Sequence, residues 1–150
     1  MMDKDKLAKQ VSVFLENKSG RLAEVCRTLG QHDINIRALC IADTSDFGIL
    51  RLIVNDPDRA VNVLQTAGFS VGSTGVLALL IPDQPGGLGT VLTYLEEHGI
   101  NVEYMYAFFI LIEGDAVVLF KVHEDALEET VKVLEDKGVG IIPAEEVHRL

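Results

Sequence analysis

Residues 17–22 read NKSGRL and are followed at residues 32–36 by HDINI. The same arrangement returns as DQPGGL at residues 83–88, followed by HGINV at residues 98–102. Both segments recur at one offset of 66 positions, from 17 to 83 and from 32 to 98. A repeat of this length is a small domain rather than one unit of a solenoid, so the sequence indicates a tandem duplication. We therefore expect two domains, at residues 1–74 and 75–150.

Each half predicts the same order of elements, β-α-β-β-α-β. The expected strands of the first half cover 7–16, 35–42, 47–55 and a short segment from 69 to 71, with a turn at 43–46. Its first helix is expected to begin with Ser19 as N-cap, and Asp56 followed by Pro57 predicts the start of the second. The expected elements of the second half are strands 76–81, 101–112, 116–122 and 141–147, with helices at 87–98 and 124–137. This order predicts an α+β fold of two ferredoxin-like repeats packed together, with antiparallel sheets and helices on one face.

The segment 77–81 is apolar at every position, so the strand it forms is expected to be covered on both faces. The two helices of a repeat cover only one face of its sheet. We therefore predict a homodimer through the other face of the second sheet. The alternative is that the sheet of the first half covers this face within the same chain.

Composition restricts the possible partners. The net charge of −10 disfavours nucleic acid, because binding there depends on Lys and Arg that neutralise phosphates. The longest apolar run, residues 107–112, is too short to span a membrane, and the charged start is not followed by the apolar segment of a signal peptide. We expect a cytoplasmic protein with no membrane partner.

No set of reactive side chains indicates catalysis. Cys26 and Cys40 are too few for a zinc site and are interpreted as buried free thiols. The four histidines form no metal-binding pattern, and His32 and His98 are expected to cap helix C-termini. We therefore predict no enzyme activity, no metal and no cofactor.

The turn before the first helix of each repeat is the candidate binding site. A glycine there lets a ligand approach the backbone, and the N–H groups of a helix start suit a carboxylate. Asn35 and Asn101 offer an amide that both donates and accepts, while Asn17 or Asp83 could accept from an ammonium group. Together these groups suit a free amino acid. The structural alternative is that glycine and asparagine only satisfy the geometry of the turn.

The chain resembles an ACT domain, the amino-acid-sensing module attached to many enzymes of amino-acid metabolism. The resemblance is carried by VFLENKSGRL (13–22) with DINI (33–36), and by IPDQPGGL (81–88) with GINV (99–102). A Pro-Gly-x-Leu turn, a helix and then Gly-Ile-Asn are typical of the family, and Ser19 replaces the proline in the first repeat. The resemblance covers about residues 7–147 and is strongest to stand-alone tandem ACT proteins that lack an enzyme domain.

The resemblance implies that ligands bind at the interface between two ACT units, through the first loop and the start of the second strand. The implied residues are Asn17, Ser19, Gly20, Arg21, Leu22 and Asn35 in the first repeat, and Asp83, Gly86, Gly87, Leu88 and Asn101 in the second. Because Gly87 stands opposite Arg21, we expect the two sites to differ in affinity.

The resulting hypothesis is a non-catalytic regulatory protein that senses an amino acid and acts on an enzyme of amino-acid metabolism. The alternative is a ligand-independent assembly or regulatory subunit of such an enzyme.

Overall fold

The computed structural model describes residues 4–43 and 46–150, so Thr44 and Ser45 of the predicted turn lie outside the described residues. The chain divides into two units. The first-repeat unit holds Lys9–Gly75 and His148–Leu150, and the second-repeat unit holds Val76–Val147 and the described residues up to Ala8. Antiparallel strand pairing with helices against the sheet is found in both units, which confirms the predicted α+β fold.

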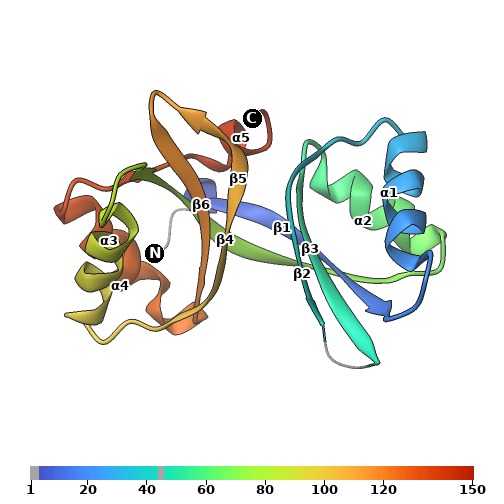
Figure 1. Ribbon diagram of the computed structural model, residues 1–150, viewed down its shortest axis with the longest axis horizontal. Helices are drawn as coiled ribbons and strands as arrows, with labels where there is room; N and C mark the ends of the chain where they lie inside the picture. The colour runs from blue at the N-terminus through green and yellow to red at the C-terminus, as the bar shows by residue number, and fades with distance from the viewer. Residues whose placement is uncertain (1–3, 44–45) are drawn as a thin grey trace. The chain divides into compact units, whose positions relative to one another are not determined.

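The first-repeat unit is built from alternating apolar strands and two amphipathic helices. Its elements are β1 (Leu7–Glu16) from Lys9 onward, α1 (Arg21–Gln31), β2 (Ile36–Asp43), β3 (Phe47–Val54), α2 (Pro57–Thr66) and the first part of β4 (Ser70–Pro82). The strand order is β2-β3-β1-β4, and Val13 of β1 lies opposite Leu50 of β3. Both helices lie on one face of this sheet (Figure 1). Val25 and Leu29 of α1 and Leu64 of α2 are fully buried against it.

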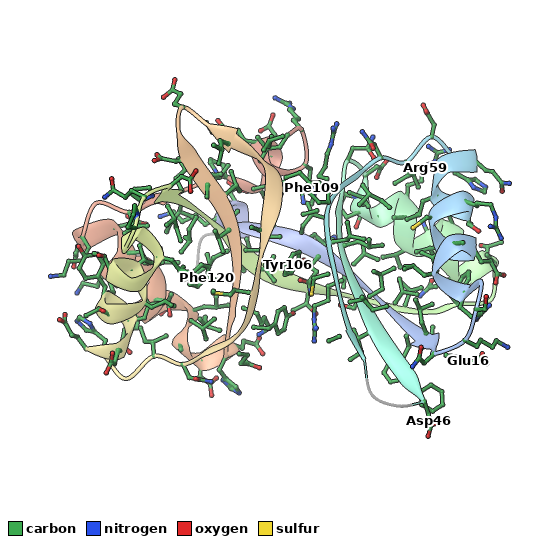
Figure 2. All side chains as sticks on the ribbon, in the orientation of Figure 1. Glu16, Asp46, Arg59, Tyr106, Phe109 and Phe120 are labelled. Atoms are coloured by element: carbon green, nitrogen blue, oxygen red, sulfur yellow. The ribbon has the colours of Figure 1, made fainter. Side chains whose placement is uncertain are left out.

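The second-repeat unit has the same plan. Its elements are η1 (Lys4–Lys6), the second part of β4, α3 (Gly87–Glu96), β5 (Val102–Ile112), β6 (Asp115–Val122), η2 (Glu124–Ala126), α4 (Leu127–Asp136), β7 (Gly140–Ile141) and α5 (Ala144–Val147). The strand order is β4-β6-β5, and β7 pairs with β4. Helices α3 and α4 cover one face of the sheet (Figure 1). Phe120 belongs to the core on that side, whereas Tyr106 extends from the other face (Figure 2).

The structure corrects two sequence-based predictions about strands. The predicted strand over 141–147 is wrong, because β7 has only two residues and a helical turn follows. The reason lies in Pro143, whose carbonyl accepts from the N–H groups of Glu146 and Val147 and so begins a helix. The strands predicted separately at 69–71 and 76–81 are one strand, since β4 runs without interruption from Ser70 to Pro82.

The non-alternating strand is buried as its composition predicts. Leu77, Leu79 and Ile81 belong to the core beneath α3 and α4, while Ala78, on the opposite face, is also fully buried. None of the helices within residues 4–43 and 46–150 combines the length and the apolar character needed to cross a bilayer.

Candidate ligand-binding turns

The turn between β1 and α1 ends in a glycine that adopts a left-handed conformation. Gly20 is the N-cap of α1 with a φ of 89°, and no side chain caps the helix in this part of the described chain. The prediction of Ser19 as N-cap is therefore wrong. Main-chain bonds hold the turn instead: the N–H of Asn17 donates to Asp46 O at 2.8 Å, and that of Arg21 donates to Lys18 O at 3.4 Å.

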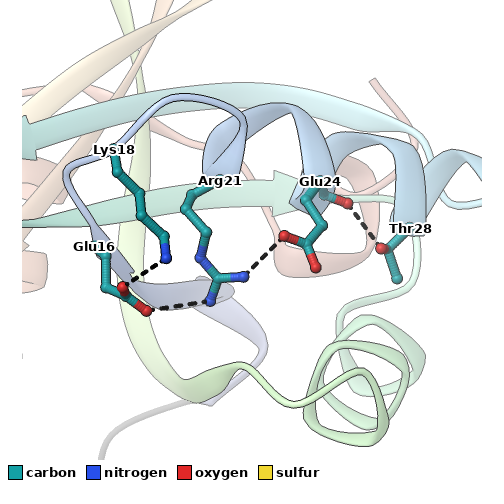
Figure 3. Close-up of polar contacts among 5 residues, drawn as sticks. All are labelled: Glu16, Lys18, Arg21, Glu24 and Thr28. Atoms are coloured by element: carbon teal, nitrogen blue, oxygen red, sulfur yellow. Dashed lines mark hydrogen bonds and ion pairs between the residues drawn. The ribbon is translucent and has the colours of Figure 1, made fainter.

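Charged side chains crowd this first turn (Figure 3). Glu16 accepts from Lys18 at 3.1 Å, and Arg21 Nη2 lies 3.8 Å from the other Glu16 oxygen. The Nη1 of Arg21 lies 2.8 Å from a carboxylate oxygen of Glu24. The hydrogen bond from Lys18, followed by its charge and that of Arg21, lowers the pKa of the Glu16 carboxyl below its ordinary value. The sequence-based interpretation singled out Arg21 but missed both glutamates, which lie outside the Ser-Gly-Arg turn.

Arg21 also packs against an aromatic ring. Its guanidinium carbon lies 4.6 Å from the centre of the Phe69 ring, a cation–π contact, and its side chain is only 24% exposed. Among the described residues its buried Nε has no hydrogen-bond partner. The guanidinium is thus fixed between two carboxylates and a ring, so a ligand carboxylate that approached it would compete with Glu16 and Glu24.

The other predicted residues of the first repeat are at the surface. Leu22, in the first turn of α1, is 39% exposed, and Asn17 and Ser19 are exposed as well. Asn35 is tied through its main chain to the end of β3. Its N–H donates to Asn55 Oδ1 at 2.9 Å, and its carbonyl accepts from the Asn55 N–H at 3.2 Å. These bonds involve only the main chain of Asn35, whose side chain is exposed just before β2.

The turn between β4 and α3 repeats the backbone conformation without an equivalent of Arg21 and its ion pairs. Gly86 is the N-cap of α3 with a φ of 83°, again with no side-chain cap in this described segment. The N–H of Gln84 donates to Pro82 O at 2.9 Å, and that of Gly87 donates to Gln84 O at 3.0 Å. A Cβ at Gly87 would lie 2.2 Å from Pro82 O, so this tight turn excludes every side chain at that position.

The predicted residues of the second repeat are distributed between two hollows. Gly87 lines a cavity of about 440 Å³, whereas Asn101 lines a second one of about 430 Å³. Leu88 is half-buried and packs against the core, and Asp83 is exposed. The first cavity also includes Tyr94, Asp115 and Lys137, which were not singled out in the sequence because they come from three separate elements.

The two equivalent histidines cap their helices, as predicted. Nδ1 of His32 lies 2.8 Å from Thr28 O, and Nδ1 of His98 lies 3.0 Å from Tyr94 O. Both cysteines are free and partly buried, and burial raises the pKa of the Cys26 thiol. These residues therefore have structural roles close to those expected from the sequence.

Comparison with known structures supports the assignment of the fold. Protein BT0572 from Bacteroides thetaiotaomicron is similar, with a TM-score of 0.91 and 41% identity over 99% of this chain and 100% of that one. The ligand-free regulatory subunit of aspartate kinase from Thermus thermophilus shares the fold, with a TM-score of 0.63 and 11% identity over 87% and 93% of the two chains. The comparison with curated proteins gave no match.

The family model for the ACT domain pair matches residues 7–150, which is nearly the whole chain. Such pairs are typical of regulatory, ligand-binding proteins. Together with the two glycine turns at equivalent positions, this match shows that the chain belongs to the family of ACT domain pairs.

Proposed function

We propose that this protein binds a free amino acid and regulates a partner without catalysing a reaction itself. The observation that carries the proposal is the duplicated turn of an ACT domain pair, in which a left-handed glycine begins the helix and no side chain caps it in the described residues. The first N–H groups of a helix have no partner within the helix and carry its positive dipole end. This environment suits the carboxylate of an amino acid.

The proposed binding residues are those that the family resemblance implies. They are Asn17, Ser19, Gly20, Arg21, Leu22 and Asn35 in the first repeat, and Asp83, Gly86, Gly87, Leu88 and Asn101 in the second. The ion pairs of Arg21 in the first turn, and the lack of a side chain at Gly87 in the second, support a difference in affinity between the two turns.

We further propose that the partner is an enzyme of amino-acid metabolism and that the protein acts as a homodimer. The fold shared with the aspartate kinase regulatory subunit supports the first point. The second is supported by the exposed apolar residues Phe109, Ile110 and Leu111 at the end of β5.

Calorimetry against the twenty standard amino acids tests the proposal, and at least one is expected to bind. Two variants then locate the ligand: Arg21→Gln with Arg27→Gln on the exposed side of α1 as control, and Asn101→Ala with Asn62→Ala as control. The turn that holds the ligand is expected to lose about ten-fold in affinity, equivalent to one charge-assisted hydrogen bond. If no amino acid binds, the sensing function is wrong.

A ligand-independent assembly subunit is the second candidate. It is favoured by the apolar end of β5, where Phe109 is 78%, Ile110 46% and Leu111 55% exposed. Exposed apolar residues that form a contiguous patch are typical of interaction surfaces. This candidate predicts that a partner enzyme is retained on the immobilised protein equally well with and without added amino acids.

A further inference from the structure

We infer that the second-repeat unit holds an amino-acid site within a single repeat, in the cavity between α3 and the segment that joins α4 to β7. This inference rests on the proposed function, since it names where and how an amino acid is recognised. It differs from the interface site implied by the family resemblance, because every lining residue belongs to one unit.

The cavity has the size and walls of a small-molecule site. Its volume of about 440 Å³ is at the small end of the range for ligand pockets, which suits a metabolite of few atoms. Leu80 of β4, Val91 of α3 and Val139 provide apolar surface. The apolar wall can therefore receive the side chain of an amino acid, while charged groups are needed for the main-chain end.

The cavity contains one positive and one negative side chain. The Nζ of Lys137 lies 5.2 Å from the centre of the Tyr94 ring, which holds the ammonium group at the wall without neutralising it. Asp115 begins β6 opposite Pro82 and supplies the carboxylate. Neither Lys137 nor Asp115 forms an ion pair within the described residues. A cation and an anion without charged partners suit the carboxylate and the ammonium group of a zwitterion.

The first repeat fills the equivalent place with its own side chain. Gly87 stands 66 positions after Arg21, as Thr90 does after Glu24. In the first repeat the Arg21 guanidinium lies over Phe69 and against Glu24. Phe69 follows the left-handed Gly68 after α2, just as Val139 follows the left-handed Gly138 after α4.

Because position 87 is glycine, the second repeat lacks the side chain that Arg21 places beside Phe69 in the first repeat. Gly140 contributes as well, since a Cβ there would come within 3.1 Å of Leu80 Cδ1 in the cavity wall. We conclude that the duplication left one copy closed by an internal arginine and the other open to a free ligand.

The experiment combines nuclear magnetic resonance with calorimetry on the full chain, using the twenty standard amino acids as probes. Amide shifts on binding are expected at Gly87, Gly138 and Gly140, and not at Gly20. Lys137→Met and Asp115→Asn are each expected to weaken binding at least ten-fold. Lys137→Arg keeps the charge and is expected to bind within a few-fold of the wild type, and Lys132→Met, on the exposed side of α4, serves as the control.

The outcomes separate this site from the proposed function. If an amino acid binds with unchanged affinity in Lys137→Met and Asp115→Asn, and the shifts centre on Gly20 or Asn101, the cavity site is overturned and the sensing function stands. If no amino acid binds the wild type, both are overturned. Both variants change side chains that are not fully buried, so a loss of binding with native melting behaviour supports the site.

Discussion

Position 21 and its repeat equivalent, position 87, show how one residue changes the character of a duplicated turn. The backbone is alike in both copies, with a φ of 89° at Gly20 and 83° at Gly86. Arg21 brings a charge that two glutamates and a ring hold in place. Gly87 brings no side chain and lies too close to Pro82 O to accept one.

The replacement Gly87→Ala is expected to destabilise the protein by about 1–3 kcal/mol, because the new methyl group meets backbone that cannot move aside freely. Gly89→Ala, two residues further along α3, is the control: nothing lies within 4 Å of the place that its new Cβ would take, and a helical Gly-to-Ala change gains up to about 1 kcal/mol. Urea unfolding of both variants measures the difference. Equal stability of the two variants would contradict the close approach at Gly87.

The charged turn predicts a measurable change at Glu16. Lys18→Met removes the hydrogen bond and charge that lower the pKa of Glu16, so that pKa is expected to rise toward its ordinary value of 4.5. Because the folded-state pKa is lowered, the stabilisation by this pair is present above the unfolded-state pKa and is lost as the pH falls through the lowered value. Carbon-detected titration of the Glu16 carboxyl measures the shift, with Lys132→Met as control. The effect on stability is expected to be small, since both side chains are exposed.

At the scale of elements, the sequence predicted the start of α2 correctly, because the capping residue itself makes the hydrogen bond that begins the helix. Asp56 caps α2 by accepting from the Arg59 N–H at 3.3 Å, with Pro57 at the first helical position. The left-handed Gly68, with a φ of 94°, follows this helix. Glycine, a residue that often interrupts strands, was misleading in β4, where Gly72 and Gly75 lie within one continuous strand.

Asp56→Ala is expected to cost about 1 kcal/mol of unfolding free energy, since it leaves an N–H group of the first helical turn without its cap. Gln65→Ala, exposed on the same helix, should change stability by no more than about 0.5 kcal/mol. Thermal and denaturant melts compare the two. If both variants melt with the wild type, Asp56 does not stabilise α2.

At the scale of the whole molecule, each repeat has its own buried core beneath its own pair of helices. The chain passes between the two units more than once. One crossing lies within β4, which contributes residues 70–75 to one unit and 76–82 to the other. The residues up to Ala8 belong with the second repeat and the last three residues with the first.

The proposed homodimer predicts a mass twice that of the chain in sedimentation equilibrium, with dissociation on dilution. The reason is that the end of β5 exposes Phe109, Ile110 and Leu111, and a second copy of the chain is a standard way to cover such side chains. A single-chain mass at all concentrations would overturn the proposed homodimer.

The sequence by itself determined the duplication, most of the helices and strands, the two glycine turns and the histidine caps at the ends of α1 and α3. These features depend on residues that are close in the chain, so spacing is enough to recognise them. Only the tertiary structure decided that Arg21 is enclosed by Glu16, Glu24 and Phe69, and that Gly87 opens a cavity beside Lys137 and Asp115. Glu16 and Glu24 are close to Arg21 in the chain, but Phe69 is tens of residues from Arg21, as Asp115 and Lys137 are from Gly87. Strand register and helix packing, rather than sequence spacing, bring these distant segments together.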